Sequence, residues 1–236
     1  MPPGARARAV AAGAAATAGA AGAAGHAATA GAAGAAAGVR PAVRDLRGHG
    51  HGRGARGPAR LTFAGGDIVV VSGLPGGGKS TLIKRAVPGG GIDSQDVRER
   101  WEARMPAFLP YAVYRPAVRV AHYAGLWRAV RSGASVVVHD CGTQAWVRAL
   151  LTRAARRRAR ALHLLLLDAT PEEALAGQAA RGRGVSAYAF ARHRGAATRL
   201  LRAAESGRLP AGCASAVLLD RAAASRIDRI AFAPER

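Results

Sequence analysis

The chain has 236 residues, enough for one α/β domain with a full hydrophobic core and too few for two large domains. It carries 35 basic and 14 acidic residues, and a net charge of +21 ordinarily indicates nucleic acid, an anionic membrane or a polyphosphate as partner. All but two of the basic residues are arginine, and alanine and glycine are abundant, so biased coding composition fits the charge as well. Two cysteines, Cys141 and Cys213, are too few for a disulfide framework and lack zinc-site spacing.

Residues 1–60 are predicted to form a tail that is disordered. An Ala/Gly tract up to Gly38 is followed by a stretch rich in Arg, Gly and His from Arg40 to Arg60. Neither half has large apolar side chains to bury, and glycine weakens helix formation. The basic half could bind nucleic acid through its phosphates, and a mis-assigned start codon explains the tail equally well.

The apolar stretch from Ala9 to Val39 is long enough to span a membrane, but frequent glycines and His26 interrupt it. The first residues also lack the Leu-rich core of a secretory signal. We therefore expect a soluble, cytoplasmic protein with no membrane partner.

Residues 61–236 are predicted to form the folded domain. A β-branched run at residues 68–71 is typical of a buried parallel strand, and a Gly-rich turn and a helix over residues 78–86 follow it. Further strand-like runs at residues 135–139, 163–167 and 216–219 alternate with helical stretches, one of which begins with Thr170 as cap. This alternation predicts a parallel sheet of about five strands with helices on both faces.

Large aromatic residues gather between the first two clear strands. We interpret them mainly as core packing, with stacking on a base or substrate as the alternative. They are Trp101, Phe108, Tyr111, Tyr114, Tyr123 and Trp127.

The turn after the first strand matches the phosphate-binding pattern G-x-x-x-x-G-K-[ST], extended by one residue. The matching residues are Gly73, Leu74, Pro75, Gly76, Gly77, Gly78, Lys79, Ser80 and Thr81. The glycines let backbone N–H groups converge on phosphate oxygens, and the helix N-terminus adds a favourable dipole. Lys79 is expected to reach the β- and γ-phosphates of a nucleoside triphosphate. Ser80 is expected to offer its hydroxyl to Mg²⁺.

Asp140 ends the second strand-like run, where the carboxyl edge of a parallel sheet faces bound phosphates. We therefore consider it a second candidate Mg²⁺ ligand, with a local capping role as the alternative.

The phosphate-binding turn, together with residues 92–98, resembles the small P-loop kinases grouped with polynucleotide kinase and zeta toxin, often labelled AAA-type kinases. The resemblance covers about residues 66–220 and continues at residues 136–140 and 168–175 and at Arg181 and Arg183. It implies a P-loop NTPase three-layer sandwich, similar to nucleoside monophosphate kinases, that binds ATP. The arginines would belong to a lid that neutralises charge on the transferring phosphoryl group, although chance placement is a rival in so Arg-rich a chain.

In these kinases an Asp after the second strand acts as general base on the acceptor hydroxyl, and a nearby Arg holds acceptor phosphate. Arg98 matches that Arg, but this register places Gln95 at the base position, between Asp93 and Asp96. A Gln can orient a hydroxyl but cannot accept its proton. Asp93 or Asp96 remains the candidate, and for Asp96 the alternative is a helix-terminal acid beside a Ser94 cap.

The sequence thus predicts a P-loop kinase-like, ATP-binding domain that transfers the γ-phosphoryl group, with Mg²⁺, to an unidentified small-molecule or nucleic-acid acceptor. The alternative, which Gln95 favours, is a nucleotide-binding switch or slow ATPase without an acceptor.

Overall fold

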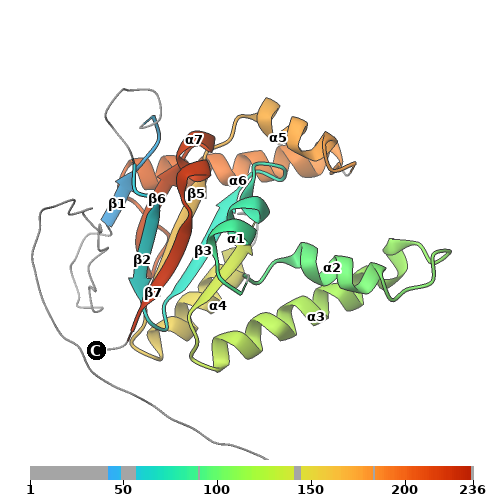
Figure 1. The fold of residues 1–236 in the computed structure, drawn as a ribbon, viewed down its shortest axis with the longest axis horizontal. Helices are drawn as coiled ribbons and strands as arrows, with labels where there is room; N and C mark the ends of the chain where they lie inside the picture. The colour runs from blue at the N-terminus through green and yellow to red at the C-terminus, as the bar shows by residue number, and fades with distance from the viewer. Residues whose placement is uncertain (1–41, 49–56, 90, 141–144, 183, 235–236) are drawn as a thin grey trace, which may run out of the picture.

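Strand β3, Ile68–Gly73, lies in the middle of the main sheet, and all six of its residues are buried. It pairs in parallel with β4, Val136–Asp140, on one side and with β5, Leu162–Leu167, on the other. The sheet continues through β6, Cys213–Leu219, to β1, Ala42–Asp45, in the order β1-β6-β5-β3-β4 (Figure 1). Its β-branched and leucine-rich central strands suit burial on both faces. The predicted parallel sheet of five strands is confirmed.

Helices cover both faces of this sheet in the computed structural model, which describes residues 42–48, 57–89, 91–140, 145–182 and 184–234. Val69 and Val71 pack into one apolar cluster with α1, Lys79–Ala86, and α7, Arg221–Arg226. Alternate residues of β3 point the other way. They pack with α3, Tyr111–Arg131, α4, Ala145–Arg156, and α6, Ala187–Glu205. The predicted three-layer sandwich is confirmed.

A second, two-stranded parallel sheet, absent from our sequence prediction, lies on the α1 side. It consists of β2, Arg60–Ala64, and β7, Arg229–Ala233. Leu61, Phe63 and Ile230 bring this pair into the same apolar cluster as α1. The two strands are 165 or more residues apart in the chain, and each is too short to give a clear pattern alone.

Strand β1 corrects the predicted boundary of the folded domain at residue 60. Ala42–Asp45 pairs with β6 along its whole length, and the next residues are held as well. Arg47 forms ion pairs with Asp45, Asp168 and Glu205 at 2.6 to 2.7 Å. The sheet therefore begins inside the predicted tail, whose other residues up to 41 and at 49–56 lie outside the described part of the chain. Four residues in a polar stretch offer too little periodicity for a strand to be recognised.

Two further helices bear on the carboxyl edge of the sheet. Helix α2, Ser94–Glu102, packs against α3, and the two project together beside β4 (Figure 1). Helix α5, Pro171–Ala179, follows β5 and begins with the predicted Thr170 cap, which forms a full capping box with Glu173. None of the described helices is long and apolar enough to cross a membrane.

A buried polar network lies at the amino end of the sheet, away from the phosphate-binding turn. Asp67 Oδ2 is 3.0 Å from His163 Nε2, and His163 Nδ1 is 2.7 Å from the Ser215 hydroxyl. Asp67 also accepts hydrogen bonds from the N–H groups of Ala64 and Ala161. Burial raises the pKa of this carboxyl, but these hydrogen bonds outweigh burial and leave the pKa below its ordinary value.

Substitution of Asp67→Asn is expected to lower the free energy of unfolding at pH 7 by about 1–3 kcal/mol, since buried partners lose a charged acceptor. Because the folded-state pKa is lowered, this stabilisation is complete above the unfolded value of 3.8 and is lost as pH falls through the folded value. Urea unfolding from pH 7 to pH 3 measures the gap between variant and wild type, with exposed Asp228→Asn as control. A gap that stays constant to pH 3 would contradict this role.

Candidate functional site

The phosphate-binding turn has the backbone that its sequence predicts. β3 ends at Gly73, and α1 begins after Gly78, whose φ of 93° lies in the left-handed region. Gly76 also has a positive φ of 88°, so glycine is needed at both positions. No described side chain caps the N-terminus of α1, and a helix N-terminus of this kind favours an anion.

Lys79 lies at the centre of this turn with only 3% of its surface exposed. Its Nζ donates hydrogen bonds to the carbonyls of Gly73 and Leu74, at 2.8 and 2.7 Å. The loop thus wraps around one buried ammonium group, which places a fixed positive charge beside the converging N–H groups. This arrangement can bind the β- and γ-phosphates of a nucleoside triphosphate.

The backbone of helix α5 packs directly against the backbone of the turn. A Cβ atom on Gly177 would lie 2.2 Å from the Gly76 carbonyl oxygen, and one on Gly76 would lie 2.0 Å from the Ala174 oxygen. Gln178 donates to the Pro75 carbonyl at 3.0 Å, and its own oxygen accepts from the Val185 N–H at 2.9 Å. The position of the turn is therefore tied to α5 and to the segment after it.

Asp93 is the acid that the structure places beside the turn. It follows Ile92, which bridges in parallel to Val138 and so extends the sheet by one residue past β4. Its carboxylate accepts a hydrogen bond from the Gln95 N–H at 2.9 Å, and the Ser80 side chain lies close enough to lower its pKa. Its second oxygen, Oδ2, is buried and has no hydrogen-bond partner among the described residues.

The helix cap at this point differs from our prediction. Asp93, in an extended conformation, is the N-cap of α2, and Ser94 is the first helical residue. Burial raises the pKa of Asp93. The attraction of a protonated His139, the Gln95 N–H, the Ser80 side chain and the charge of Lys79 together hold the pKa below its ordinary value.

Two histidines that our sequence analysis did not select complete the surroundings of Asp93. His139 Nδ1 is 3.5 Å from Asp93 Oδ1. Burial, together with the charge of Lys79, lowers the pKa of His139 to about 4, so the ring is neutral at pH 7. His122, on α3, has a buried Nδ1 with no partner among the described residues, and burial lowers its pKa as well.

Strand alternation separates His139 from Asp140. Val137 packs on the α1 side of the sheet, whereas Val136 and Val138 pack on the α3 and α4 side. Asp140 shares the second side, and its Oδ2 forms an ion pair with Arg148 Nη1 of α4 at 3.0 Å. The period of two along the strand could have shown that His139, rather than Asp140, shares the side of the sheet on which α1 packs. The role of Asp140 as a Mg²⁺ ligand stays a prediction without support from this geometry.

The remaining predicted residues are unevenly placed. Arg181 Nη2 lies 3.3 Å from the Thr81 hydroxyl, and Arg183 lies outside the described residues. Arg98 instead pairs with Glu102 at 2.7 Å and lies 4.0 Å over the ring of Tyr111. Asp96 pairs with Lys84 of α1 at 3.4 Å.

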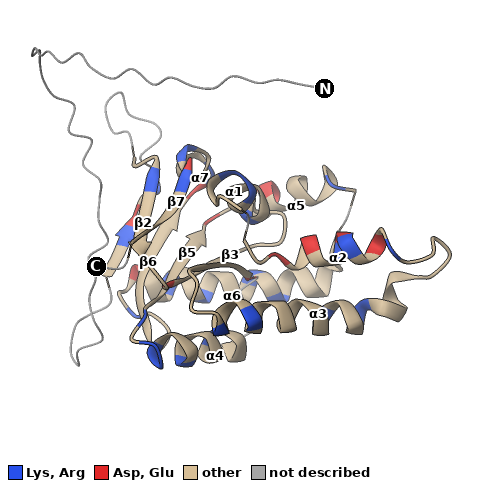
Figure 2. Cartoon of the chain, turned by 60° about the horizontal axis from the view of Figure 1, so that its bottom comes forward, with Lys and Arg blue, Asp and Glu red and all other residues tan. Residues whose placement is uncertain are grey.

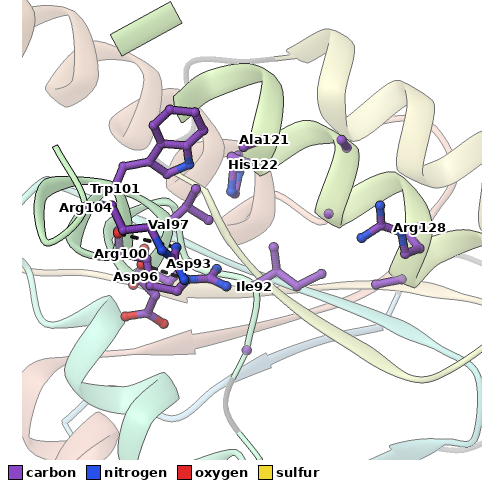
Figure 3. A pocket seen from close by; sticks show the side chains of 14 residues that line it. Ile92, Asp93, Asp96, Val97, Arg100, Trp101, Arg104, Ala121, His122 and Arg128 are labelled. Carbon is purple, nitrogen blue, oxygen red and sulfur yellow. Dashed lines mark hydrogen bonds between the residues drawn. The ribbon is translucent and has the colours of Figure 1, made fainter. Parts of the chain in front are cut away.

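A cavity of about 630 Å³ opens between α2, α3 and the Ile92 edge of the sheet (Figure 3). Asp93 and His122 line it, so the two unpartnered buried atoms, Asp93 Oδ2 and His122 Nδ1, belong to residues of the cavity wall. Trp101 contributes an aromatic wall, whereas Gln95 does not line the cavity. The cavity and the phosphate-binding turn therefore meet at Asp93.

The donor set near Ser80 fits a hard divalent cation. Mg²⁺ prefers oxygen ligands and keeps several waters. The Ser80 hydroxyl supplies one such oxygen, and the Asp93 carboxylate lies close enough for Ser80 to lower its pKa. The described part of the chain contains no group of three or more His, Cys, Asp and Glu residues that could hold a metal.

Substitution of Gly177→Ala is expected to weaken ATP binding, because the new methyl group would displace the Gly76 carbonyl and with it the turn. Overpacking of this kind costs about 1–3 kcal/mol, or about 5- to 150-fold in Kd. Gly195→Ala in α6 is the matched control, since its Cβ would meet only the flexible end of Arg199, at 3.3 Å. Calorimetric titration with ATP measures both, and equal affinities would contradict the proposed contact.

Substitution of His139→Gln is expected to flatten the dependence of stability on pH. The ring takes up a proton near pH 6.5 when unfolded and near pH 4 when folded, so acidification across that window favours unfolding. The wild type should lose up to about 3 kcal/mol through this group, and the variant should not. Denaturant unfolding between pH 7 and pH 4 measures this difference, and parallel profiles would exclude a buried neutral imidazole.

The folded domain matches one known protein family over most of its length. Residues 68–203, more than half of the chain, match the AAA domain family. Among solved structures, a protein from Chloroflexus aurantiacus J-10-fl with a provisional assignment as a kinase aligns at 17% identity and a TM-score of 0.46, over 69% of this chain and 88% of its own. No curated protein matches the sequence. The chain belongs to the AAA domain family, as a nucleotide-binding protein with a kinase-like P-loop fold.

Proposed function

We propose that the protein transfers the γ-phosphoryl group of ATP, with Mg²⁺, to an acceptor bound in the cavity between α2 and α3. The observation that carries this proposal is the position of Asp93. Its carboxylate lies close enough to Ser80 and Lys79 of the phosphate-binding turn for both to lower its pKa, and the same residue lines the cavity. One side chain thus faces both the triphosphate and the space for a second substrate.

The turn would bind the triphosphate through its converging N–H groups and the Lys79 ammonium. Ser80 would hold Mg²⁺, which, when bound, neutralises charge on the β- and γ-phosphate oxygens, and Asp93 would face the acceptor. Arg181, close to Thr81 at the start of α1, is on the correct side to neutralise charge on the γ-phosphate.

The acceptor hydroxyl would lie against Asp93 Oδ2, the buried oxygen without a partner. In the transfer, the acceptor oxygen bonds to the γ-phosphorus, the bond from that phosphorus to the β–γ bridging oxygen breaks, and ADP leaves. The proton of the hydroxyl passes to Asp93. A carboxylate with a lowered pKa is a weak base, so its main contribution is to orient the hydroxyl while the transition state is neutralised by cations.

The alternative of a nucleotide switch or slow ATPase rested on Gln95 at the position of the base. Gln95 does not line the cavity, whereas Asp93 and Asp96 do. This placement supports a kinase, because the acid that a phosphotransferase needs is present two residues earlier than the register on Arg98 implied.

ADP release with Mg²⁺ is expected to rise when a true acceptor is added, and Lys79→Ala should reduce that stimulated rate by about 100-fold or more. Lys84→Ala is the matched control, because Lys84 is an exposed lysine of the same helix, and it should stay within about twofold of wild type. A panel of nucleosides, sugars, nucleotides and 5′-hydroxyl oligonucleotides supplies the acceptors. ATP binding with no stimulated turnover by any acceptor would favour the switch.

A further inference from the structure

The cavity between α2 and α3 is lined by three arginines: Arg100 on α2, Arg104 just after it, and Arg128 on α3 (Figure 3). Two of them donate side-chain hydrogen bonds to backbone carbonyls. Arg100 Nε donates to the Asp96 carbonyl at 3.2 Å, and Arg104 Nη1 donates to the Arg100 carbonyl at 3.5 Å. Within the described residues none of the three forms an ion pair. Backbone carbonyls do not neutralise a guanidinium, so three positive charges surround one cavity.

The two carboxylates of the cavity wall are already engaged. Asp93 lies close enough to the Lys79 ammonium for that charge to lower its pKa, and Asp96 pairs with Lys84 of α1. Helix α3 contains no acidic residue, and Figure 2 shows blue but no red along it. The charge of the cavity is therefore positive on balance once its own acids are accounted for.

From this charge we infer that the acceptor is a small molecule with an oxyanion of its own, a phosphate or a carboxylate, bound by Arg100 and Arg104 at a distance from its reactive hydroxyl. This inference rests on the proposed function, because it assigns the second substrate to the same site. Arginine is suited to the task, since its planar fork binds carboxylate or phosphate through two parallel hydrogen bonds.

Arg98 shows why position on the helix matters. It belongs to the same helix, but its Nε is bound to Glu102 and its guanidinium lies over Tyr111. It does not line the cavity. The arginine that resemblance selected as an acceptor ligand is thus neutralised, and the arginines two and six residues further along carry the unneutralised charge.

Helix α2 sets the length of the acceptor. Asp93 caps the helix, and Arg100 follows seven residues later, which corresponds to roughly 10 Å along the axis. Helical side chains lean toward the N-terminus, so the guanidinium is nearer to Asp93 than its Cα is. A cavity of about 630 Å³ has the size of a typical small-molecule site. A hydroxyl at Asp93 and an anion at Arg100 then describe a molecule of about the size of a nucleotide or a sugar phosphate.

The residues that line the middle of the cavity favour an acceptor with a flat ring. Trp101 presents an indole wall, and Gly91, Ala124 and Gly125 on the other walls leave room beside it. His122 Nδ1, without a partner among the described residues, offers one hydrogen bond to a polar group of the acceptor.

Binding can be measured without turnover because Trp101 is one of only three tryptophans. In the full-length Trp127→Phe, Trp146→Phe variant, Trp101 is the only indole, and its fluorescence reports on the cavity. The probes are matched pairs: adenosine and adenosine 5′-phosphate, glucose and glucose 6-phosphate, and glyceramide and glycerate. An 8-mer 5′-hydroxyl oligonucleotide tests a polymer.

At least one charged probe is expected to quench the Trp101 fluorescence saturably. Its neutral partner is expected to bind at least tenfold more weakly. Arg100→Gln and Arg104→Gln should each weaken binding of the charged probe by about 10-fold or more, while Arg100→Lys restores part of it. Arg119→Gln, an exposed arginine of α3 outside the cavity, should leave it unchanged. If a charged probe is also a substrate, the glutamine variants should raise its KM and leave the KM for ATP unaltered.

Equal response to charged and neutral partners, no response to any charged small molecule, or a response to the oligonucleotide alone would each overturn the inference. Binding of a charged probe without Lys79-dependent transfer would instead leave the inference standing and remove the proposed function. Transfer to neutral acceptors alone would keep the function and reject the anionic acceptor.

Discussion

The carboxylate of Asp93 lies where α1, α2 and β4 come together. It caps α2 through the Gln95 N–H, lies close enough to Ser80 on α1 for that side chain to lower its pKa, and lies beside His139 on β4. A buried charge is costly unless hydrogen bonds compensate it, so the position of the carboxylate is set by its donors. Its second oxygen, Oδ2, has no hydrogen-bond partner among the described residues. The orientation of α2, and with it the cavity, depends on the contacts of this carboxylate.

The phosphate-binding turn, the five-stranded sheet and the Thr170 cap could be predicted because each depends on short-range pattern. Positive-φ glycines, buried β-branched runs and capping residues express local physics, which sequence records directly. Asp93 and Asp96 could not be separated in this way, because the choice depends on a one-residue bridge from Ile92 to Val138. β1 and the β2–β7 pair were not predicted for the same reason, because each strand pairs with a strand far away in the chain.

Arginines were the least predictable part of the site. In a chain with so many, a matching position carries little information, and only the partners distinguish one guanidinium from the next. Arg98 pairs with the Glu102 carboxylate and lies over the Tyr111 ring, whereas Arg100 donates to one backbone carbonyl and lines the cavity. A related limit applies to the turn. Its motif does not predict that Gly177 and Gln178 of α5 contact the turn and fix its position. Motifs specify the residues that touch a ligand better than those that hold these residues in place.

The pairing of the chain's two ends has a consequence for synthesis. Ala42 is beside Ser215 in the main sheet, and Arg60 is beside Arg229 in the small one. The strands synthesised first therefore stay unpaired until their partners, more than 160 residues later, have been synthesised. Contacts between residues so far apart in the chain slow folding. Until β7 emerges, the apolar side of β3 and α1 that β7 helps to cover stays open to chaperones and to other nascent chains. A stop codon a few residues before Arg229 would leave the candidate site residues in place but would leave that surface uncovered for the lifetime of the protein.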